Sequence, residues 1–359
     1  MPVPAPDTLR NAREAMLWEP LDGNRVRCYL CAHRCVISEG KAGICRVRVN
    51  QRGGLYTLVY ELAISGNVDP IEKKPLFHFL PGTTSFSVAT AGCNFSCRFC
   101  QNWNISQMPK ELAGRIEGTR LPPRRVVDLA LAHSCASIAY TYTEPTIFFE
   151  YALDTAKLAS AAGLKNVFVT NGFMTAEALD AIRGHLHAAN VDLKAFSDAY
   201  YRRVCGGRLQ PVLDSISRMH EMGIWVEVTT LIVPGANDSE HELRAIAEFI
   251  ASVSPDIPWH VSRFHPDYQM LDRGATPVET IRRAVAIGRE AGLRYVYAGN
   301  VPGEESESTH CPGCGHVVVR RHGFYVAAIH GTPTKGALLC PRCQTPIPMV
   351  LPDAQAQRP

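Results

Sequence analysis

Three cysteines, Cys93, Cys97 and Cys100, stand at a CxxxCxxC spacing that constrains this chain more than any other feature. Three thiolates can ligate three irons of a four-iron cluster and leave the fourth iron open to an exchangeable ligand, whereas a fourth cysteine would close the cluster. A zinc loop and a redox-active cysteine pair are the alternative interpretations. The run 85–90 reads as a strand that leads straight into the loop. This context favours an open cluster at the end of a strand.

The composition is that of a globular chain with no nucleic-acid or membrane partner indicated. The 359 residues are 46% hydrophobic and 20% charged, enough for a sizeable core with one or two small modules. The 37 basic and 34 acidic residues are spread without blocks, so no nucleic-acid arm and no membrane-binding patch are expected. Residues 1–7 lack the apolar core of a signal peptide, and no apolar run reaches the roughly 18 residues of a membrane span. We therefore expect a cytoplasmic protein.

Eleven of the 13 cysteines fall into three groups with metal-ligand spacing. A disulfide scaffold is not expected, because such scaffolds are small and secreted. The groups are Cys28, Cys31, Cys35 and Cys45; Cys93, Cys97 and Cys100; and Cys311, Cys314, Cys340 and Cys343. The two remaining cysteines, Cys135 and Cys205, are interpreted as small apolar residues that are buried or half-buried, and not as metal ligands.

The cysteine groups divide the chain into a Cys-rich N-terminal module over 1–80, a central domain over 81–305 and a small C-terminal module over 306–350. In the central domain, apolar strands alternate with amphipathic helices. The predicted strands are 86–90, 137–142, 166–170, 189–193, 225–231, 260–264 and 294–297. Such alternation predicts an α/β fold with a parallel sheet covered by helices, and it fits a doubly wound sheet as well as a barrel.

Polar residues follow several of these predicted strands, where the sites of α/β barrels are found. These candidate site residues are Glu144, Asn171, Asp192, Lys194 and His265. Each also has a structural interpretation. Glu144 could cap the next helix, Asn171 could belong to an ordinary turn, Asp192 and Lys194 could form a rim ion pair, and His265 could be structural.

The two outer cysteine groups predict metal sites. For Cys28, Cys31, Cys35 and Cys45 we expect structural zinc, with an auxiliary iron–sulfur cluster that relays electrons as the alternative. The two CPxC turns at Cys311 and Cys340 predict a zinc ribbon, although the interval between them is longer than usual. A rubredoxin-like iron site has the same spacing.

The central motif resembles the signature of the radical S-adenosylmethionine (SAM) enzymes, in which three cysteines hold a [4Fe-4S] cluster. The resemblance implies a partial (β/α)6 barrel and reductive cleavage of SAM. Only Glu144 matches the usual Gly-Gly-Glu, whose backbone and carboxylate hold the amino group of SAM. In the activating enzymes for glycyl radical proteins, Asp-x-Lys reaches SAM, and Asp192 and Lys194 match it.

Two further segments match the activating enzymes, one that contains Asn171 and one that ends in His265. Thr170-Asn171-Gly172 matches their Asp-Thr-Asn-Gly, except that Val169 replaces the Asp, so the cation site that uses this carboxylate is not expected. Phe264-His265 resembles a Phe-His pair found late in those enzymes.

Nearly the whole chain resembles the AmmeMemoRadiSam-system radical SAM enzymes, which are related to the pyruvate formate-lyase activating enzymes. The matching segments are 27–35, 39–45, 69–82, 100–107, 142–146, 297–303 and the terminal cysteine turns. The resemblance implies an electron donor such as flavodoxin or ferredoxin, and association with Memo-like and AMMECR-like proteins.

The expected function is therefore hydrogen abstraction by a radical SAM enzyme. The substrate could be a protein, as in glycyl radical activation, or a small molecule held in a closed pocket with a few polar groups. The alternative from a different class is a non-catalytic metal-binding adaptor. The intact cysteine triad and Glu144 argue against the adaptor.

Overall fold

The structure is a computed structural model that describes residues 12–301 and 303–352. Its centre is one nine-stranded sheet in the order β15-β14-β13-β12-β11-β10-β8-β7-β9. Seven of these strands are parallel: β8 (Thr84–Thr90), β10 (Ser137–Tyr140), β11 (Lys165–Thr170), β12 (Ala188–Asp192), β13 (Trp225–Ile232), β14 (Trp259–Arg263) and β15 (Val296–Gly299). All seven predicted strands are thus confirmed, with ends shifted by one or two residues.

Two antiparallel strands extend the sheet beyond β8. They are β7 (Leu62–Pro70), which pairs with β8, and β9 (Thr119–Arg120), which pairs with β7. The expected boundary at residue 80 therefore falls after the first strand of this sheet, and the division into 1–80, 81–305 and 306–350 stays a proposal.

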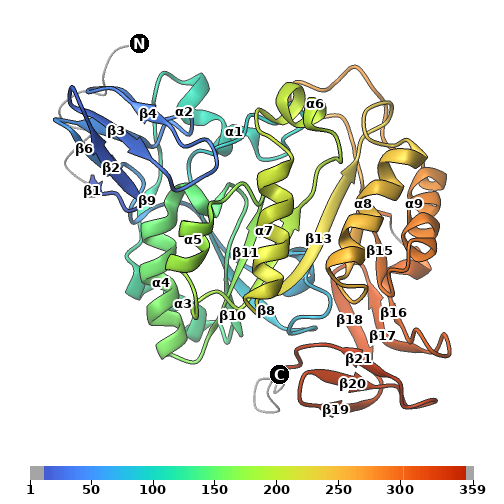
Figure 1. Ribbon diagram of the computed structural model, residues 1–359. Helices are drawn as coiled ribbons and strands as arrows, with labels where there is room; N and C mark the ends of the chain where they lie inside the picture. The colour runs from blue at the N-terminus through green and yellow to red at the C-terminus, as the bar shows by residue number, and fades with distance from the viewer. Residues whose placement is uncertain (1–11, 302, 353–359) are drawn as a thin grey trace.

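Each interval between consecutive parallel strands contains at least one helix, and the helices lie on the outside of the sheet (Figure 1). The α-helices are α1 (Trp103–Ser106), α2 (Met108–Glu111), α3 (Pro123–Ala132), α4 (Phe149–Ala161), α5 (Ala176–Ala181), α6 (Asp198–Tyr200), α7 (Gln210–Glu221), α8 (Glu240–Val253) and α9 (Val278–Glu290). Three short elements are 3-10 helices: η2 (Ile71–Lys73), η3 (Pro145–Phe148) and η5 (Glu305–Glu307). The element η4 (Tyr201–Cys205) is a π-helix.

Helix α8 illustrates why these segments fold as they do. The side chain of Ser239 accepts a hydrogen bond from the backbone N–H of Glu242 and so caps the first turn. The apolar residues Leu243, Ile246, Ala247 and Ile250 recur at helical spacing and are all buried. The parallel strand β10 is buried at every position, as expected for a strand with a covered face on each side.

The N-terminal module contains two small antiparallel sheets (Figure 1). One is formed by β1 (Arg13–Glu14), β6 (Gly54–Thr57) and β5 (Arg48–Gln51), the other by β2 (Trp18–Leu21), β3 (Arg25–Cys28) and β4 (Val36–Ile37). Cys31 forms an isolated β-bridge with Met174, and the N–H of Ala32 donates to the carbonyl of Phe173. Since Phe173 and Met174 follow β11, this module lies at the carboxyl ends of the parallel strands.

The C-terminal module lies at the opposite end of the large sheet (Figure 1). It consists of β16 (Thr309–His310), β17 (Val317–His322) and β18 (Tyr325–Ile329) in one sheet, and β19 (Thr332–Thr334), β20 (Ala337–Leu339) and β21 (Pro346–Pro348) in another. Val350 exchanges backbone hydrogen bonds with the segment at His78 and Leu80. That segment packs against Ala139, Val167 and Ala188 of the sheet.

A buried polar network joins this module to the start of β13. Glu227 accepts hydrogen bonds from the N–H groups of Phe77 and His78 at 2.9 and 2.8 Å, and His260 lies 2.7 Å away. Arg321 of β17 donates to the carbonyl of Phe77 at 2.6 Å. These contacts fix the C-terminal module beneath the sheet, away from the carboxyl ends of the strands. None of the described helices is long and apolar enough to cross a membrane.

Candidate active site

A cavity of about 550 Å³ is lined by residues from all seven parallel strands or from the loops that follow them. The lining includes the residues Cys93, Cys97, Cys100, Tyr142, Glu144, Asn171, Asp192, Lys194, Leu231, Ser262 and Asn300. It continues down to Glu72, Lys74, Phe77 and Phe324 at the other end. One cavity can touch every strand only if the sheet curls around it. The sheet therefore encloses the candidate site.

The three cysteines of the CxxxCxxC loop all line this cavity. Gly92 opens the loop with φ of +106°, and a Cβ there would lie 2.8 Å from the side chain of Val47. The N–H of Phe95 donates to Sγ of Cys93 at 3.3 Å. The thiol of Cys100 lies 3.2 Å from Oγ of Ser106.

The chemistry of this donor set fits an iron–sulfur cluster. Burial raises the pKa of the Cys93 thiol far above its usual value. A side-chain hydrogen bond with Cys205 and burial do the same for Cys97. Thiolates at such a site form when a cation compensates their charge, and soft thiolates suit iron. Cys205 is fully buried as predicted, but the sequence did not indicate its contact with Cys97.

Glu144 lies at the cavity wall and is 1% exposed. Its Oε1 accepts hydrogen bonds from the N–H and the hydroxyl of Thr146 at 3.0 and 2.5 Å and from the hydroxyl of Thr170 at 2.7 Å. Its Oε2 accepts the N–H of Asn171 at 2.8 Å. The side chain of Glu144 thus caps η3, in agreement with its structural interpretation. Its hydrogen bond with Thr170 also links the loop after β10 to β11. Among the described residues Oε2 accepts only the bond from the N–H of Asn171, and since a carboxylate oxygen can accept about two bonds, one acceptor site on it stays open to a ligand.

Asn171 holds the cysteine loop against the end of β11. Its amide nitrogen donates to Oδ1 of Asn94 at 2.7 Å and lies 3.8 Å from Sγ of Cys93. Its Oδ1 accepts the N–H of Phe173 at 3.0 Å. The structure therefore brings Asn171 to Cys93. Its hydrogen bond with Phe173 is also the kind of contact that its structural interpretation, a residue in a turn, implies.

Asp192 and Lys194 form an ion pair of 3.0 Å that lines the cavity. The side chain of Lys194 is 13% exposed. Burial would lower the pKa of Lys194, but its ion pair with Asp192 and its proximity to Cys97 and Cys205 raise it well above its usual value. The ammonium group is therefore fixed and charged beside the cysteine loop.

His265 is the predicted site residue that the structure leaves outside the described cavity lining. It is exposed, and its Nε2 lies 3.4 Å from the side-chain nitrogen of Gln101. Because Gln101 follows Cys100 and lines the cavity, His265 stands at the rim of the site.

Sequence reasoning missed a charged cluster at the inner end of the cavity. The ammonium group of Lys74 lies 2.7 Å from Asp69 and 4.5 Å from the centroid of the Tyr142 ring, and the Tyr142 hydroxyl donates to Asp69. Burial lowers the pKa of Lys74 to about 8, although Asp69 opposes this shift. Tyr142 has φ of +62°, which is rare for a bulky residue. The sequence did contain a signal for this cluster. Segments 69–82 and 142–146, which contain Lys74 and Tyr142, match the family motifs, but neither residue was given a role.

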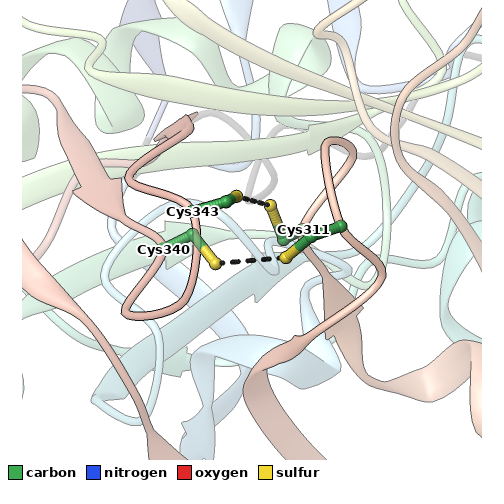
Figure 2. A group of neighbouring side chains, drawn as sticks. Cys311, Cys340 and Cys343 are labelled. Carbon is green, nitrogen blue, oxygen red and sulfur yellow. Dashed lines mark hydrogen bonds between the residues drawn. The ribbon is translucent and has the colours of Figure 1, made fainter.

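The four cysteines of the N-terminal module line a second, smaller cavity together with His33 and Arg48. The four cysteines of the C-terminal module instead gather tightly, with all sulfurs within 4.8 Å of one another. Figure 2 shows the contacts between the two turns, where Cys311 lies 3.5 Å from Cys343 and Cys314 lies 3.6 Å from Cys340. Tetrahedral zinc with Zn–S bonds of about 2.3 Å places its sulfurs roughly 3.8 Å apart. The C-terminal group is therefore the right size for a single metal ion.

Comparison with known proteins identifies the family. The radical SAM superfamily model matches residues 87–250. The protein MJ0808 of Methanocaldococcus jannaschii is 44% identical over 330 residues, which are 91% of this chain and 97% of that protein. The chain belongs to the radical SAM superfamily and is an enzyme; the superfamily implies a [4Fe-4S] cluster and SAM.

More distant relatives include activating enzymes. The pyruvate formate-lyase-activating enzyme of Clostridium pasteurianum is 22% identical over 58% of this chain and 91% of its own length. The putative glycyl-radical enzyme activating enzyme MJ1632 of Methanocaldococcus jannaschii is 23% identical over 58% of this chain and 77% of its own length. A domain of the pyruvate-formate lyase-activating enzyme from Bacteroides vulgatus has a TM-score of 0.41 at 20% identity, covering 46% of this chain and 99% of that one.

Proposed function

We propose that Cys93, Cys97 and Cys100 hold the [4Fe-4S] cluster of a radical SAM enzyme that abstracts hydrogen from a substrate bound in the central cavity. The observation that carries the proposal is that the three thiols share this cavity with Glu144, Asn171, Asp192 and Lys194. When bound, the cluster and SAM supply reductive cleavage to methionine and a 5′-deoxyadenosyl radical. We propose that the six strand–helix units from β8 to α9, followed by β15, form a partial (β/α)6 barrel.

The chain's own residues bind and orient the SAM. Lys194 provides a fixed cation for the methionine carboxylate, and Asp192 provides an acceptor for the ribose or amino group. The free acceptor site on Oε2 of Glu144 suits the amino group. Asn171 positions Cys93 through its side-chain amide. His265, at the rim, is proposed to contact SAM or substrate only on closure of the site.

For the substrate, similarity to the activating enzymes supports a protein segment that enters at the carboxyl ends of the strands. The inner charged cluster supports a second candidate, a small molecule with a polar or anionic group. Lys74 offers such a group a cation in a cavity floored by buried side chains. The non-catalytic adaptor would leave the shared cavity of cysteines and charged groups without a use.

The outer modules complete the proposal. The C-terminal group is proposed to hold structural zinc in a ribbon-like module, with a single iron as the alternative. Partners proposed from the family resemblance are a flavodoxin or ferredoxin as electron donor and Memo-like and AMMECR-like proteins of the AmmeMemoRadiSam system.

The test is anaerobic. The reconstituted, reduced protein is incubated with SAM, and 5′-deoxyadenosine and methionine are measured against a Cys97→Ser variant. Formation of both products in the wild type and their loss in the variant is expected. Absence of cleavage by a fully loaded and reduced wild type would contradict the proposal and favour the adaptor.

A further inference from the structure

The pocket of the N-terminal module is lined by all four cysteines of that module, together with His33 and Arg48. These cysteines are Cys28, Cys31, Cys35 and Cys45. Within the described chain, however, no three of their sulfurs lie within 4.8 Å of one another, whereas the four C-terminal sulfurs do. A single tetrahedral ion needs sulfurs roughly 3.8 Å apart. The N-terminal sulfurs therefore do not form the tight group that a single tetrahedral ion needs.

The same molecule contains a reference for each kind of site, the cluster motif at Cys93 and the single-ion group at Cys311. The three sulfurs of the CxxxCxxC loop, which belong to the superfamily's cluster motif, also fail to gather within 4.8 Å among the described residues. In their spacing the N-terminal thiols therefore resemble the cluster loop and differ from the single-ion site of the C-terminal module.

From this geometry we propose that Cys28, Cys31, Cys35 and Cys45 bind a second, fully cysteine-ligated [4Fe-4S] cluster. This proposal replaces the expectation of structural zinc at this position. Four thiolates occupy all four irons, so the site has no open coordination position and suits electron transfer. The cluster assignment is independent of the proposed function, whereas the relay role described below rests on it.

Arg48 supplies an independent observation. Its side chain is 2% exposed, lines the same pocket and donates through Nη2 to Glu150 and to the carbonyl of Met16. Its Nε and Nη1 are buried and have no hydrogen-bond partner among the described residues. These two buried nitrogens carry three N–H groups, and in a pocket of thiols such unsatisfied donors need an anionic acceptor. The sulfurs of a four-iron cluster with four thiolates provide acceptors, and such hydrogen bonds tune its potential.

The site is connected directly to the catalytic loop. His33 lines the N-terminal pocket, and its Nε2 lies 2.9 Å from the carbonyl oxygen of Asn94, the neighbour of Cys93. A one-electron carrier protein would reduce the N-terminal cluster, which would pass that electron through this contact to the cluster at Cys93. One electron enters and one leaves, so the second cluster is unchanged after each transfer.

The test uses the full chain with Cys93, Cys97 and Cys100 replaced by serine. This variant lacks the catalytic cluster and leaves the N-terminal pocket intact. Iron, zinc and acid-labile sulfide per chain are measured after anaerobic purification and reconstitution, with electron paramagnetic resonance of the reduced protein. About four irons and four sulfides are expected, beyond any metal at Cys311. Adding Cys28→Ser and Cys45→Ser should remove the sulfide.

Labile sulfide separates the alternatives, because a rubredoxin-like iron at the C-terminal module has none. A triple variant with zinc at both outer sites and no sulfide would overturn the proposal. If the variant fails to fold, Mössbauer spectroscopy of the wild type decides: roughly eight cluster irons support the proposal and roughly four contradict it. Loss of SAM cleavage with eight irons present would refute the proposed function alone.

Discussion

The imidazole Nε2 of His33 lies 2.9 Å from the carbonyl oxygen of Asn94, so the N-terminal module is hydrogen-bonded to the loop that carries Cys93. The same imidazole packs edge-on against Phe173 at 4.8 Å between ring centroids. A module with its own cysteine pocket is thus held against the CxxxCxxC loop at the carboxyl ends of the strands.

Replacing His33 with leucine should slow product formation when a flavodoxin or ferredoxin supplies electrons. The variant removes the contact to Asn94 and costs about 1 kcal/mol of stability through the lost hydrogen bond. Dithionite can reach the catalytic cluster directly and should restore the rate. The exposed His133→Leu variant is the matched control. Equal rates for both variants with the protein donor would argue against the relay.

Cys97→Ser and Cys205→Ser should have opposite effects although the two thiols are neighbours. Loss of Cys97 removes one of three cluster ligands, so bound iron and 5′-deoxyadenosine should fall to background. Cys205→Ser should retain the cluster, because three ligands suffice for the open-iron arrangement. Iron content and product yield check both. A Cys205 variant without a cluster would show that a fourth thiol is needed.

Lys194→Gln should weaken SAM binding about 10- to 100-fold, because a charge-assisted hydrogen bond contributes about 1.5–3 kcal/mol. The cluster should remain, since Lys194 supplies no ligand to it. Equilibrium binding to the oxidised, reconstituted protein measures the effect separately from turnover. The exposed Lys157→Gln variant serves as control. Unchanged affinity in the Lys194 variant would leave only the rim ion pair as its role.

Cys340→Ser should remove one metal ion and unfold the C-terminal module, because a structural metal contributes on the order of 10 kcal/mol. Cys340 is fully buried, and its sulfur contacts that of Cys314 at 3.6 Å. Metal analysis and limited proteolysis after residue 306 provide the measurement. Cys135→Ser, which changes a buried thiol outside the three groups, should keep the metal. A protease-resistant, metal-free Cys340 variant would contradict a structural metal.

Glu72 should make the protein less stable as the pH rises from 4.5 to about 7. Burial raises its pKa from 4.5 to about 7, against the opposing effects of Arg321 and the N–H of Gly82. The folded state therefore keeps a proton that the unfolded chain has lost. This stabilisation is complete below pH 4.5 and disappears above pH 7, a change of roughly 3 kcal/mol.

Glu72→Gln removes this titration and keeps an acceptor for Gly82. The variant should be more stable than the wild type at pH 8.5, with a smaller difference at pH 5. Urea unfolding at both pH values, with the exposed Glu248→Gln variant as control, measures the difference. A wild type that unfolds equally at both pH values would show that Glu72 is ionised throughout.

The sequence by itself determined the α/β alternation, all seven parallel strands, the three cysteine groups and the polar residues that follow the strands. These features depend on local spacing: strands and helices bury apolar residues at their own periods, and metal-binding cysteines lie a few residues apart. For the same reason the positions of Cys93, Asp192 and Lys194 at the ends of strands could be predicted from local spacing.

Only the tertiary structure decided which residues from distant segments meet. Arg48 of β5 lines the cysteine pocket, and the ammonium group of Lys74 lies over the ring of Tyr142. His265 lies at the rim of the site, and Cys205 contacts Cys97. The tertiary structure also placed the N-terminal and C-terminal modules at opposite ends of the sheet. Such contacts join residues far apart in the chain, and the packing of the whole core fixes them, so no local pattern could specify them.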